Sequence, residues 1–548
     1  MKIALYLILM LAFFGLMIFI GFVCRKKAVS TDGFLLGGRN VGAWLTAFAY
    51  GTSYFSAVVF VGYAGQFGYK FGVASTWIGL GNAFIGSLLA WVILGRRTRL
   101  MTRHLKTATM SDFFGKRFNS KPLKIAAAII IFVFLIPYTA SLYNGLSRLF
   151  AMAFDLPFWV CIIIMSVLTA IYVIAGGYMA TAINDFIQGI IMAFGIVAVI
   201  TAVILSHGGW TEIFMSLAAV NDAEVSAQAG VFTSFFGPDV ISLFFVIILT
   251  SLGTWGLPQM VQKFYAIKDE SAIIKGTIIS TVFAVIVAGG CYFLGGFSRL
   301  YPEAAADGYD AIIPAMMQEL SPVLIGLVII LVLSASMSTL SSLSMTSAST
   351  VTLDLIKPYC KNVMTEKKQV ITIRAFIVVF IVISAVIAIV QYYAKTSFIA
   401  QMMGVSWGAL AGAFLAPFLY GLYSKKTTKA AVWFSYIYGV GVMLLYLLYS
   451  LWLKNYFILP AIIASPLNLG AMVMLSDLIF VPVISLFTKK PDAEYVDKIF
   501  ACYQRTIIVP ASVALVDEEP APETASHEFF AEEKAETSAN DNTDGNNV

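Results

Sequence analysis

The sequence predicts an all-α polytopic membrane protein, and three observations lead to this fold class. Of the 548 residues, 59% are hydrophobic and only 12% are charged, a balance that soluble globular proteins do not show. The hydrophobic residues gather in runs long enough to cross a bilayer, which takes about 20 residues of helix. Two of these runs are interrupted at mid-span by glycine and polar residues, at corresponding places in the two halves of the chain.

Thirteen apolar segments are predicted as transmembrane helices. The first is too long for the hydrophobic part of a signal peptide, and no small-residue cleavage site follows it, so we expect it to be retained. In order, the segments are residues 3–24, 41–67, 72–95, 124–152, 157–177, 183–206, 238–264, 271–297, 322–356, 370–393, 397–423, 429–452 and 460–488.

The positions of lysine and arginine predict the orientation. With the N-terminus outside, most of the 35 Lys and Arg residues fall at the cytoplasmic ends of the segments, and Lys263 at the end of segment 238–264 is placed among them. An odd number of segments then puts the C-terminus in the cytoplasm. The predicted location is the plasma or inner cell membrane.

These segments divide the chain into six predicted parts. The last part is polar and acidic, so we expect disorder, in a tail that either only adds solubility or docks a regulator. The parts are an extra helix with its loop (1–40), a first five-helix repeat (41–206), an extracellular loop (207–237), a second five-helix repeat (238–423), two C-terminal helices (424–490) and the cytoplasmic tail (491–548).

The two interrupted segments predict the core of the fold. Ala49–Gly65 combines glycines with Ser and Thr, and Thr250–Gln259 combines glycines with Pro258, so both are poor helix sequences at membrane depth. Unwound backbone is tolerated there only where it is buried in protein or lines a cavity, and its free carbonyls can bind a cation. Their paired placement predicts an inverted repeat of two five-helix halves.

A row of hydroxyls marks segment 322–356. Ser334, Ser338, Ser341 and Ser342 recur at helical spacing on one face, and Thr339 is turned by about 100° from Ser338. Several neutral oxygens with a carboxylate nearby suit a hard cation such as Na⁺. The same hydroxyls can instead bond to their own helix or allow close helix packing, so both interpretations stay open.

Asp185 is the acidic residue of most interest, because it follows a glycine turn and opens segment 183–206. One interpretation is that it caps the helix and interacts with the helix dipole. The other is that it faces the serine row as a cation ligand or ion relay.

The sequence contains no P-loop, GxSxG, HExxH or CxxC motif, and its five cysteines and three histidines are scattered. We therefore expect neither ATP-driven transport nor an enzyme, and no cofactor. A membrane sensor is also disfavoured, because the tail has no pattern of a kinase or cyclase output module.

Four stretches resemble the sodium:solute symporter family: Phe34–Gly65, Ile171–Gly189, Gly256–Ala266 and Ser334–Leu355. The resemblance covers roughly residues 1–490. It implies a LeuT-type core of ten helices in a 5+5 inverted repeat, with one helix before it and two after it.

The resemblance also implies cation sites. A common sodium site would use the backbone carbonyls of Thr52, Phe55 and Ala335 with the hydroxyls of Ser338 and Thr339. Some family members have a second sodium site, whose positions are matched here by Asp185, Ser338, Ser341 and Ser342. Coupling to one or two sodium ions stays open.

For the solute, the resemblance implies a central cavity between the two interrupted segments. Proline carriers of the family have an Asp where this chain has Tyr54, which counts against proline. Aromatic rings with a few hydroxyls and amides suit a small organic solute. The predicted lining residues are Tyr54, Ser56, Tyr138, Thr139, Thr254, Trp255 and Gln259.

The expected function is therefore a sodium-coupled symporter that imports a small organic solute, an amino acid or a carboxylate, by alternating access. The alternatives are a sodium/sugar symporter and a proton-coupled carrier of the same fold, with Asp185 as the proton site. The expected partners are Na⁺, the solute and the lipid bilayer, with no nucleic acid, and the protein is expected to act as a monomer.

Overall fold

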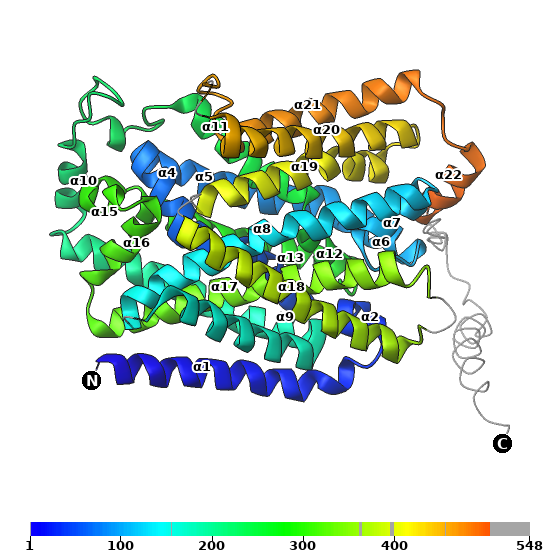
Figure 1. Ribbon diagram of the computed structural model, residues 1–548, viewed down its shortest axis with the longest axis horizontal. Helices are drawn as coiled ribbons and strands as arrows, with labels where there is room; N and C mark the ends of the chain where they lie inside the picture. Colours follow the sequence, from blue (N-terminus) through cyan, green and yellow to red (C-terminus); the bar gives the residue numbers. More distant parts are fainter. Residues whose placement is uncertain are drawn as a thin grey trace, which may run out of the picture. The chain divides into compact units, whose positions relative to one another are not determined.

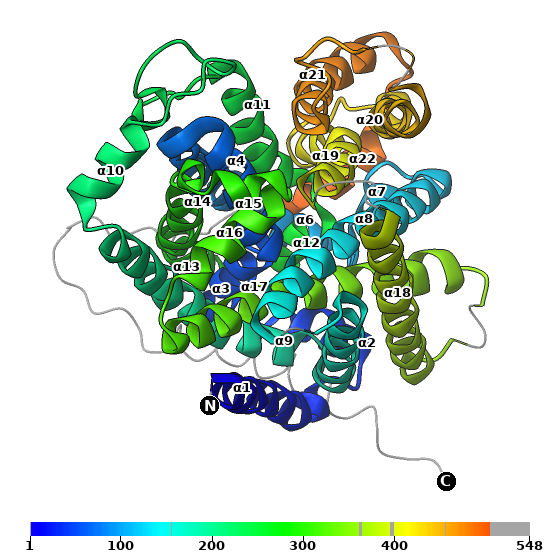
Figure 2. The same ribbon diagram turned by 60° about the vertical axis from the view of Figure 1, so that its left-hand side comes forward.

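A computed structural model describes residues 2–154, 156–360, 364–394, 399–454, 456 and 458–504. Helices make up almost all of this part of the chain, and an isolated parallel bridge joins Val41 to Ile267. In Figures 1 and 2, α1 lies at one edge of the bundle and α20 and α21 lie at the opposite edge. The expectation of an all-α protein is confirmed.

The helices follow the predicted apolar segments, and several are continued by short 3-10 or π-helical turns. The helices are α1 (Lys2–Cys24), α2 (Thr31–Leu36), α3 (Ala43–Tyr54), α4 (Ala64–Phe71), α5 (Thr76–Gly81), α6 (Arg96–His104), α7 (Met110–Arg117), α8 (Lys121–Phe154), α9 (Phe158–Ser206), α10 (Trp210–Ala218), α11 (Val240–Ser251), α12 (Pro258–Tyr265), α13 (Glu270–Ala284), α14 (Gly290–Gly295), α15 (Pro302–Ala306), α16 (Tyr309–Gln318), α17 (Pro322–Thr350), α18 (Glu366–Ala394), α19 (Ile399–Tyr423), α20 (Lys429–Leu448), α21 (Pro466–Phe487) and α22 (Ala493–Phe500). The turns used below are η3 (Val58–Tyr63), η8 (Leu252–Gly256) and η11 (Val351–Ile356).

By length and composition, ten helices among the described residues can cross a membrane, so this is a multi-pass membrane protein. A bent pair, Val240–Gly256 with Pro258–Tyr265 at 48°, raises the number to eleven. Two of the ten, Val58–His104 and Phe158–Ser206, have 47 and 49 residues, more than twice the length of about 20 that a bilayer needs. The number thirteen therefore stays a prediction, which depends on how these two long helices are divided.

Both long helices contain a glycine in a backbone conformation that other residues rarely adopt. Gly72 has φ 63° and Gly177 has φ 58°. At Gly177 a Cβ atom would also lie 2.9 Å from Phe34, so the turn and the close contact both require glycine. Gly177 lies at the junction between the predicted segments 157–177 and 183–206.

The centre of the bundle is α17 with η11. Every residue from Leu331 to Asp354 is buried, and α17 packs against α9, α8, α18 and α3. The hydroxyl row of this helix therefore faces protein and not lipid. An apolar lipid-facing stripe, present on α1 and α18, is missing from this stretch.

Two long connections meet at one end of the bundle. Residues 207–237 contain α10, and residues 298–321 contain α15 and α16. Arg299 joins them, because its guanidinium lies 2.6 Å from Asp222 and 4.2 Å from the Phe232 ring centroid.

The predicted tail differs from the structure in its first part. We expected disorder from residue 491, but α22 forms and buries Val496, Ile499 and Phe500. The Asp492 side chain caps this helix, because it accepts hydrogen bonds from the backbone N–H groups of Glu494 and Tyr495. The apolar face of α22 packs on the bundle, which explains the order. From Arg505 onwards the predicted tail lies outside the described residues.

Candidate cation and solute site

The site begins at a break in the helical path that follows α3. The helix ends at Tyr54, and Phe55 has extended backbone angles (φ −101°, ψ 99°) before η3 resumes the helical path. Glycine, serine and threonine favour this interruption because they are weak helix formers or compete for backbone hydrogen bonds. Because α3 ends here, carbonyls near its end lack the backbone N–H partners that a continuous helix would supply.

Four of the five oxygens predicted for the common sodium site lie together, where α3 meets α17. The Ser338 hydroxyl donates to the Thr52 carbonyl at 3.0 Å and to the Ala335 carbonyl at 3.2 Å. The Thr339 hydroxyl lies 3.3 Å from the Thr52 carbonyl and 3.1 Å from the Ala335 carbonyl. The fifth predicted oxygen, the Phe55 carbonyl, belongs to the residue at the break itself.

This donor set has the chemistry of a sodium site. It consists of two carbonyls and two hydroxyls, all neutral, and all four residues are at most 1% exposed. The hydroxyl hydrogens now point to the carbonyls, and a cation would replace these hydrogen bonds with oxygen contacts. No group of three or more His, Cys, Asp or Glu that would hold a transition metal occurs among the described residues.

The residues predicted for a second sodium site adopt a different arrangement. The Ser341 hydroxyl donates to the Ser338 carbonyl at 2.8 Å, along its own helix. The Ser342 hydroxyl lies 2.8 Å from the Ser53 hydroxyl and accepts a 2.9 Å hydrogen bond from the Lys263 ammonium. That ammonium also lies 3.8 Å from a carboxylate oxygen of Asp185. Lys263 therefore contacts two of the four residues predicted for the second sodium site, Asp185 and Ser342.

Asp185 is buried inside α9, eight residues after the Gly177 turn. An N-cap precedes the first turn of its helix, so the capping interpretation of Asp185 is wrong. Its carboxylate accepts no hydrogen bond from the described residues, and Lys263 supplies its ion-pair partner.

The expected place of Lys263 among loop lysines is also wrong. It lies on α12, one turn and a half after the break at Leu257, and it is only 3% exposed. The sequence does contain a signal for this burial, because Lys263 follows a predicted helix break within an apolar segment. Its partner Asp185 is distant in the sequence, so only the fold reveals the pair.

The seven residues predicted to contact the solute are all buried, at most 5% exposed, but they divide into two groups. Four have their polar atoms engaged: Tyr54 donates to the Thr250 carbonyl, Thr139 to Leu135, Thr254 to Ser251, and Trp255 to Ile85. Three have buried polar atoms without a hydrogen-bond partner among the described residues: Ser56, Tyr138 and Gln259.

Trp407 on α19 joins the unpartnered group, and no pattern in the sequence identified it. Its ring lies 5.8 Å from the Tyr138 ring, edge to face, and 6.3 Å from the Tyr54 ring. Its indole N–H also has no partner among the described residues. Buried polar groups without a partner are rare in proteins, so these groups are candidates for binding a solute.

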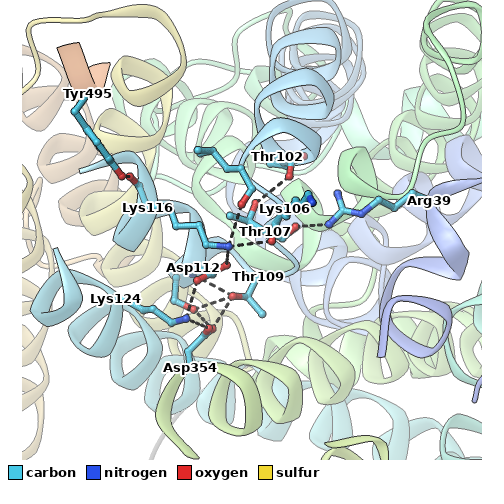
Figure 3. Close-up of polar contacts among 12 residues, drawn as sticks. Arg39, Thr102, Lys106, Thr107, Thr109, Asp112, Lys116, Lys124, Asp354 and Tyr495 are labelled. Carbon is cyan, nitrogen blue, oxygen red and sulfur yellow. Dashed lines mark hydrogen bonds and ion pairs between the residues drawn. The ribbon is translucent and has the colours of Figure 1, made fainter. Parts of the chain in front are cut away.

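A second polar network fixes the far end of the same central helix (Figure 3). Asp354 on η11 accepts hydrogen bonds from Thr109, at 2.6 Å, and from Ser111, and it pairs with Lys124 at 3.0 Å. Lys124 also binds Asp112 at 2.7 Å. This network connects η11, which continues α17, to the start of α7 and α8.

Comparison with known proteins places the whole chain. A model of the sodium:solute symporter family matches residues 34–439. The osmoregulated proline transporter OpuE of Bacillus subtilis (strain 168) is 28% identical over 489 residues, which cover 87% of this chain and 94% of that protein. A sodium/proline symporter of Staphylococcus aureus (strain JH9) is 28% identical over 507 residues, covering 89% of this chain and 93% of that protein.

Among solved structures, the substrate-bound outward-open state of a Na⁺-coupled sialic acid symporter superposes with a TM-score of 0.69. The alignment covers 89% of this chain and 98% of that one, at 16% identity. At this identity the likeness concerns the fold alone.

Proposed function

Because this chain belongs to the sodium:solute symporter family, we propose that it is a sodium-coupled symporter that imports a small organic solute by alternating access. The main support is the position of the Thr52 carbonyl, which meets the Ser338 and Thr339 hydroxyls across two helices. Bound there, Na⁺ would fix the broken helical path against α17. Whatever factor Na⁺ adds to solute affinity, the solute must add to Na⁺ affinity.

The proposed solute is an amino acid or a carboxylate. Ser56, Tyr138, Gln259 and Trp407 offer buried N–H and O–H donors, which suit carboxylate oxygens. The side-chain carbonyl of Gln259 is a buried acceptor that suits an amino or imino group. The two named relatives are proline transporters, but Tyr54 replaces the acid that the family's proline carriers have in the break. We therefore do not assign proline as the solute and include it among the amino acids to be tested for uptake.

The proposed architecture is thirteen transmembrane helices with a LeuT-type 5+5 repeat, the N-terminus outside and the C-terminus in the cytoplasm of a cell membrane. The breaks after α3 and at η8 support the repeat, because each interrupts one helix and the two interrupted helices belong to different halves of the chain. The protein would act as a monomer.

The test is uptake by the purified full chain in proteoliposomes, with an inward Na⁺ gradient and with K⁺ in its place. A panel of labelled amino acids, small carboxylates and sugars covers the proposed and alternative solutes. Uptake of an amino acid or carboxylate only with Na⁺ supports the proposal. Uptake that persists without Na⁺ and increases in acid would indicate proton coupling, and uptake of sugars alone would indicate the sugar alternative.

A further inference from the structure

The position predicted for a second sodium ion already holds a charge. Lys263 is buried on α12, and its ammonium contacts two of the four residues predicted for that ion: Ser342 at 2.9 Å and Asp185 at 3.8 Å. We propose that Lys263 is a tethered cation that fills this position, so that the carrier binds one Na⁺ and not two. This inference rests on the proposed function and concerns its ion stoichiometry.

The charges around the position support one cation only. A buried carboxylate is costly without an opposite charge, and Lys263 supplies that charge to Asp185. A sodium ion added beside the ammonium would place two positive charges close together away from water, which is strongly unfavourable. Two further contacts of the ammonium among the described residues are neutral: the Tyr178 ring at 5.3 Å and the Ser342 hydroxyl.

The remaining predicted ligands are used in other contacts. The Ser341 hydroxyl is bonded to the Ser338 carbonyl, and Ser342 is bonded to Ser53 as well as to Lys263. Since Lys263 donates to Ser342, the Ser342 proton is free to point to Ser53. The two serine hydroxyls thus have partners without a second ion, and the Asp185 carboxylate has Lys263 as its opposite charge.

The tethered cation is also connected to the common site. Ser53 lies next to Thr52 in the chain, and the Thr52 carbonyl is the oxygen shared by Ser338 and Thr339. A chain of contacts therefore runs from Asp185 through Lys263, Ser342 and Ser53 to the common site. Lys263 is in this sense a positioning residue for the Na⁺ ligands on α3.

The test is to count bound ²²Na⁺ per molecule of purified full-length protein at equilibrium. The wild type should bind one Na⁺. Lys263→Gln should bind two, because Asp185 and Ser342 are then open to an ion, and its uptake should become sigmoidal in Na⁺. Lys263→Arg keeps the charge and should bind one. Asp185→Asn/Lys263→Gln removes both charges and should also bind one.

Each outcome separates the two proposals. Wild-type protein that binds two Na⁺ overturns the tethered cation but leaves the sodium symporter in place, whereas wild-type protein that binds none overturns the symporter. One Na⁺ in Lys263→Gln, with wild-type affinity, also overturns the tethered cation. If that variant does not fold, recovery of folded protein by Asp185→Asn/Lys263→Gln supports the charge pair, and failure to recover it refutes the pair.

Discussion

Removal of one hydroxyl from the common site should weaken activation by Na⁺ while leaving the protein folded. In Ser338→Ala the cation loses one of its oxygens, and in Thr339→Val the hydroxyl is replaced by a methyl group of similar size. A polar contact to a charged group contributes about 1.5–3 kcal/mol. The substitution also removes the hydrogen bond of the same hydroxyl to the Thr52 carbonyl, which contributes about 1 kcal/mol when no cation takes its place.

The difference gives the expected effect on Na⁺ binding. It is about 0.5–2 kcal/mol, which raises the half-activating Na⁺ concentration by about 2- to 30-fold. Because both hydroxyls share the Thr52 carbonyl, the effects of the two substitutions should not add in the double variant. At saturating Na⁺ the maximal uptake rate should stay close to that of the wild type.

The assay is the initial rate of uptake in proteoliposomes against Na⁺ concentration, with ionic strength held constant by K⁺. Ser336→Ala is the matched control, because Ser336 lies buried on the same helix and its hydroxyl donates to the Val332 carbonyl of its own helix, at 2.7 Å. If Ser338→Ala and Thr339→Val, both folded, keep the Na⁺ dependence of the wild type, the site is refuted and its hydroxyls serve packing.

Three further changes test other parts of the structure. Gln259→Leu should raise the half-saturating solute concentration by about 10-fold or more, because both polar atoms of its amide are buried with no hydrogen-bond partner in the described part of the chain; an unchanged value would remove Gln259 from the solute site. Gly177→Ala should lower the free energy of unfolding by about 1–3 kcal/mol, because the residue has a positive φ and its Cβ would meet Phe34. Gly42→Ala serves as the control, because a Cβ at Gly42 meets no atom within 4 Å. The third change concerns pH: the hydrogen bond from Arg299 lowers the pKa of Asp222, so the pair is complete above the unfolded pKa of about 3.9 and is lost as the pH falls through the folded pKa. After correction for the intrinsic exchange rate, which itself falls in acid, the protection of amides in residues 219–230 should therefore decrease in acid, and Asp222→Asn should show the same decrease at neutral pH; equal protection in that variant and the wild type at neutral pH would show that the pair does not hold the loop.

The sequence was informative wherever local chemistry decides the structure. The serine spacing of α17 and the glycine-rich break after α3 depend on neighbouring residues, and the structure brings Thr52, Ala335, Ser338 and Thr339 together as expected. The family resemblance supplied the pairing between the two helices, which spacing alone does not contain.

The residues that were missed depend on contacts between distant parts of the chain. Lys263 follows a helix break, and its charge was counted with the loop lysines because its partner Asp185 lies on another helix. Trp407 sits in an apolar helix where a tryptophan is unremarkable until Tyr54 and Tyr138 are placed beside it. The number of helices depends on a similar effect, because at Gly72 and Gly177 the chain turns through a positive φ and the next helical segment follows at once.

The complete burial of α17 and η11 from Leu331 to Asp354 covers the proposed ion ligands with protein. Changes in acyl-chain length or bilayer thickness act first on helices with exposed apolar faces, such as α1, α18 and α20. Those helices can tilt to match a thinner or thicker bilayer, while the oxygens on α17 contact only protein. The affinity of the proposed site for Na⁺ should thus stay nearly constant across membranes of different lipid composition.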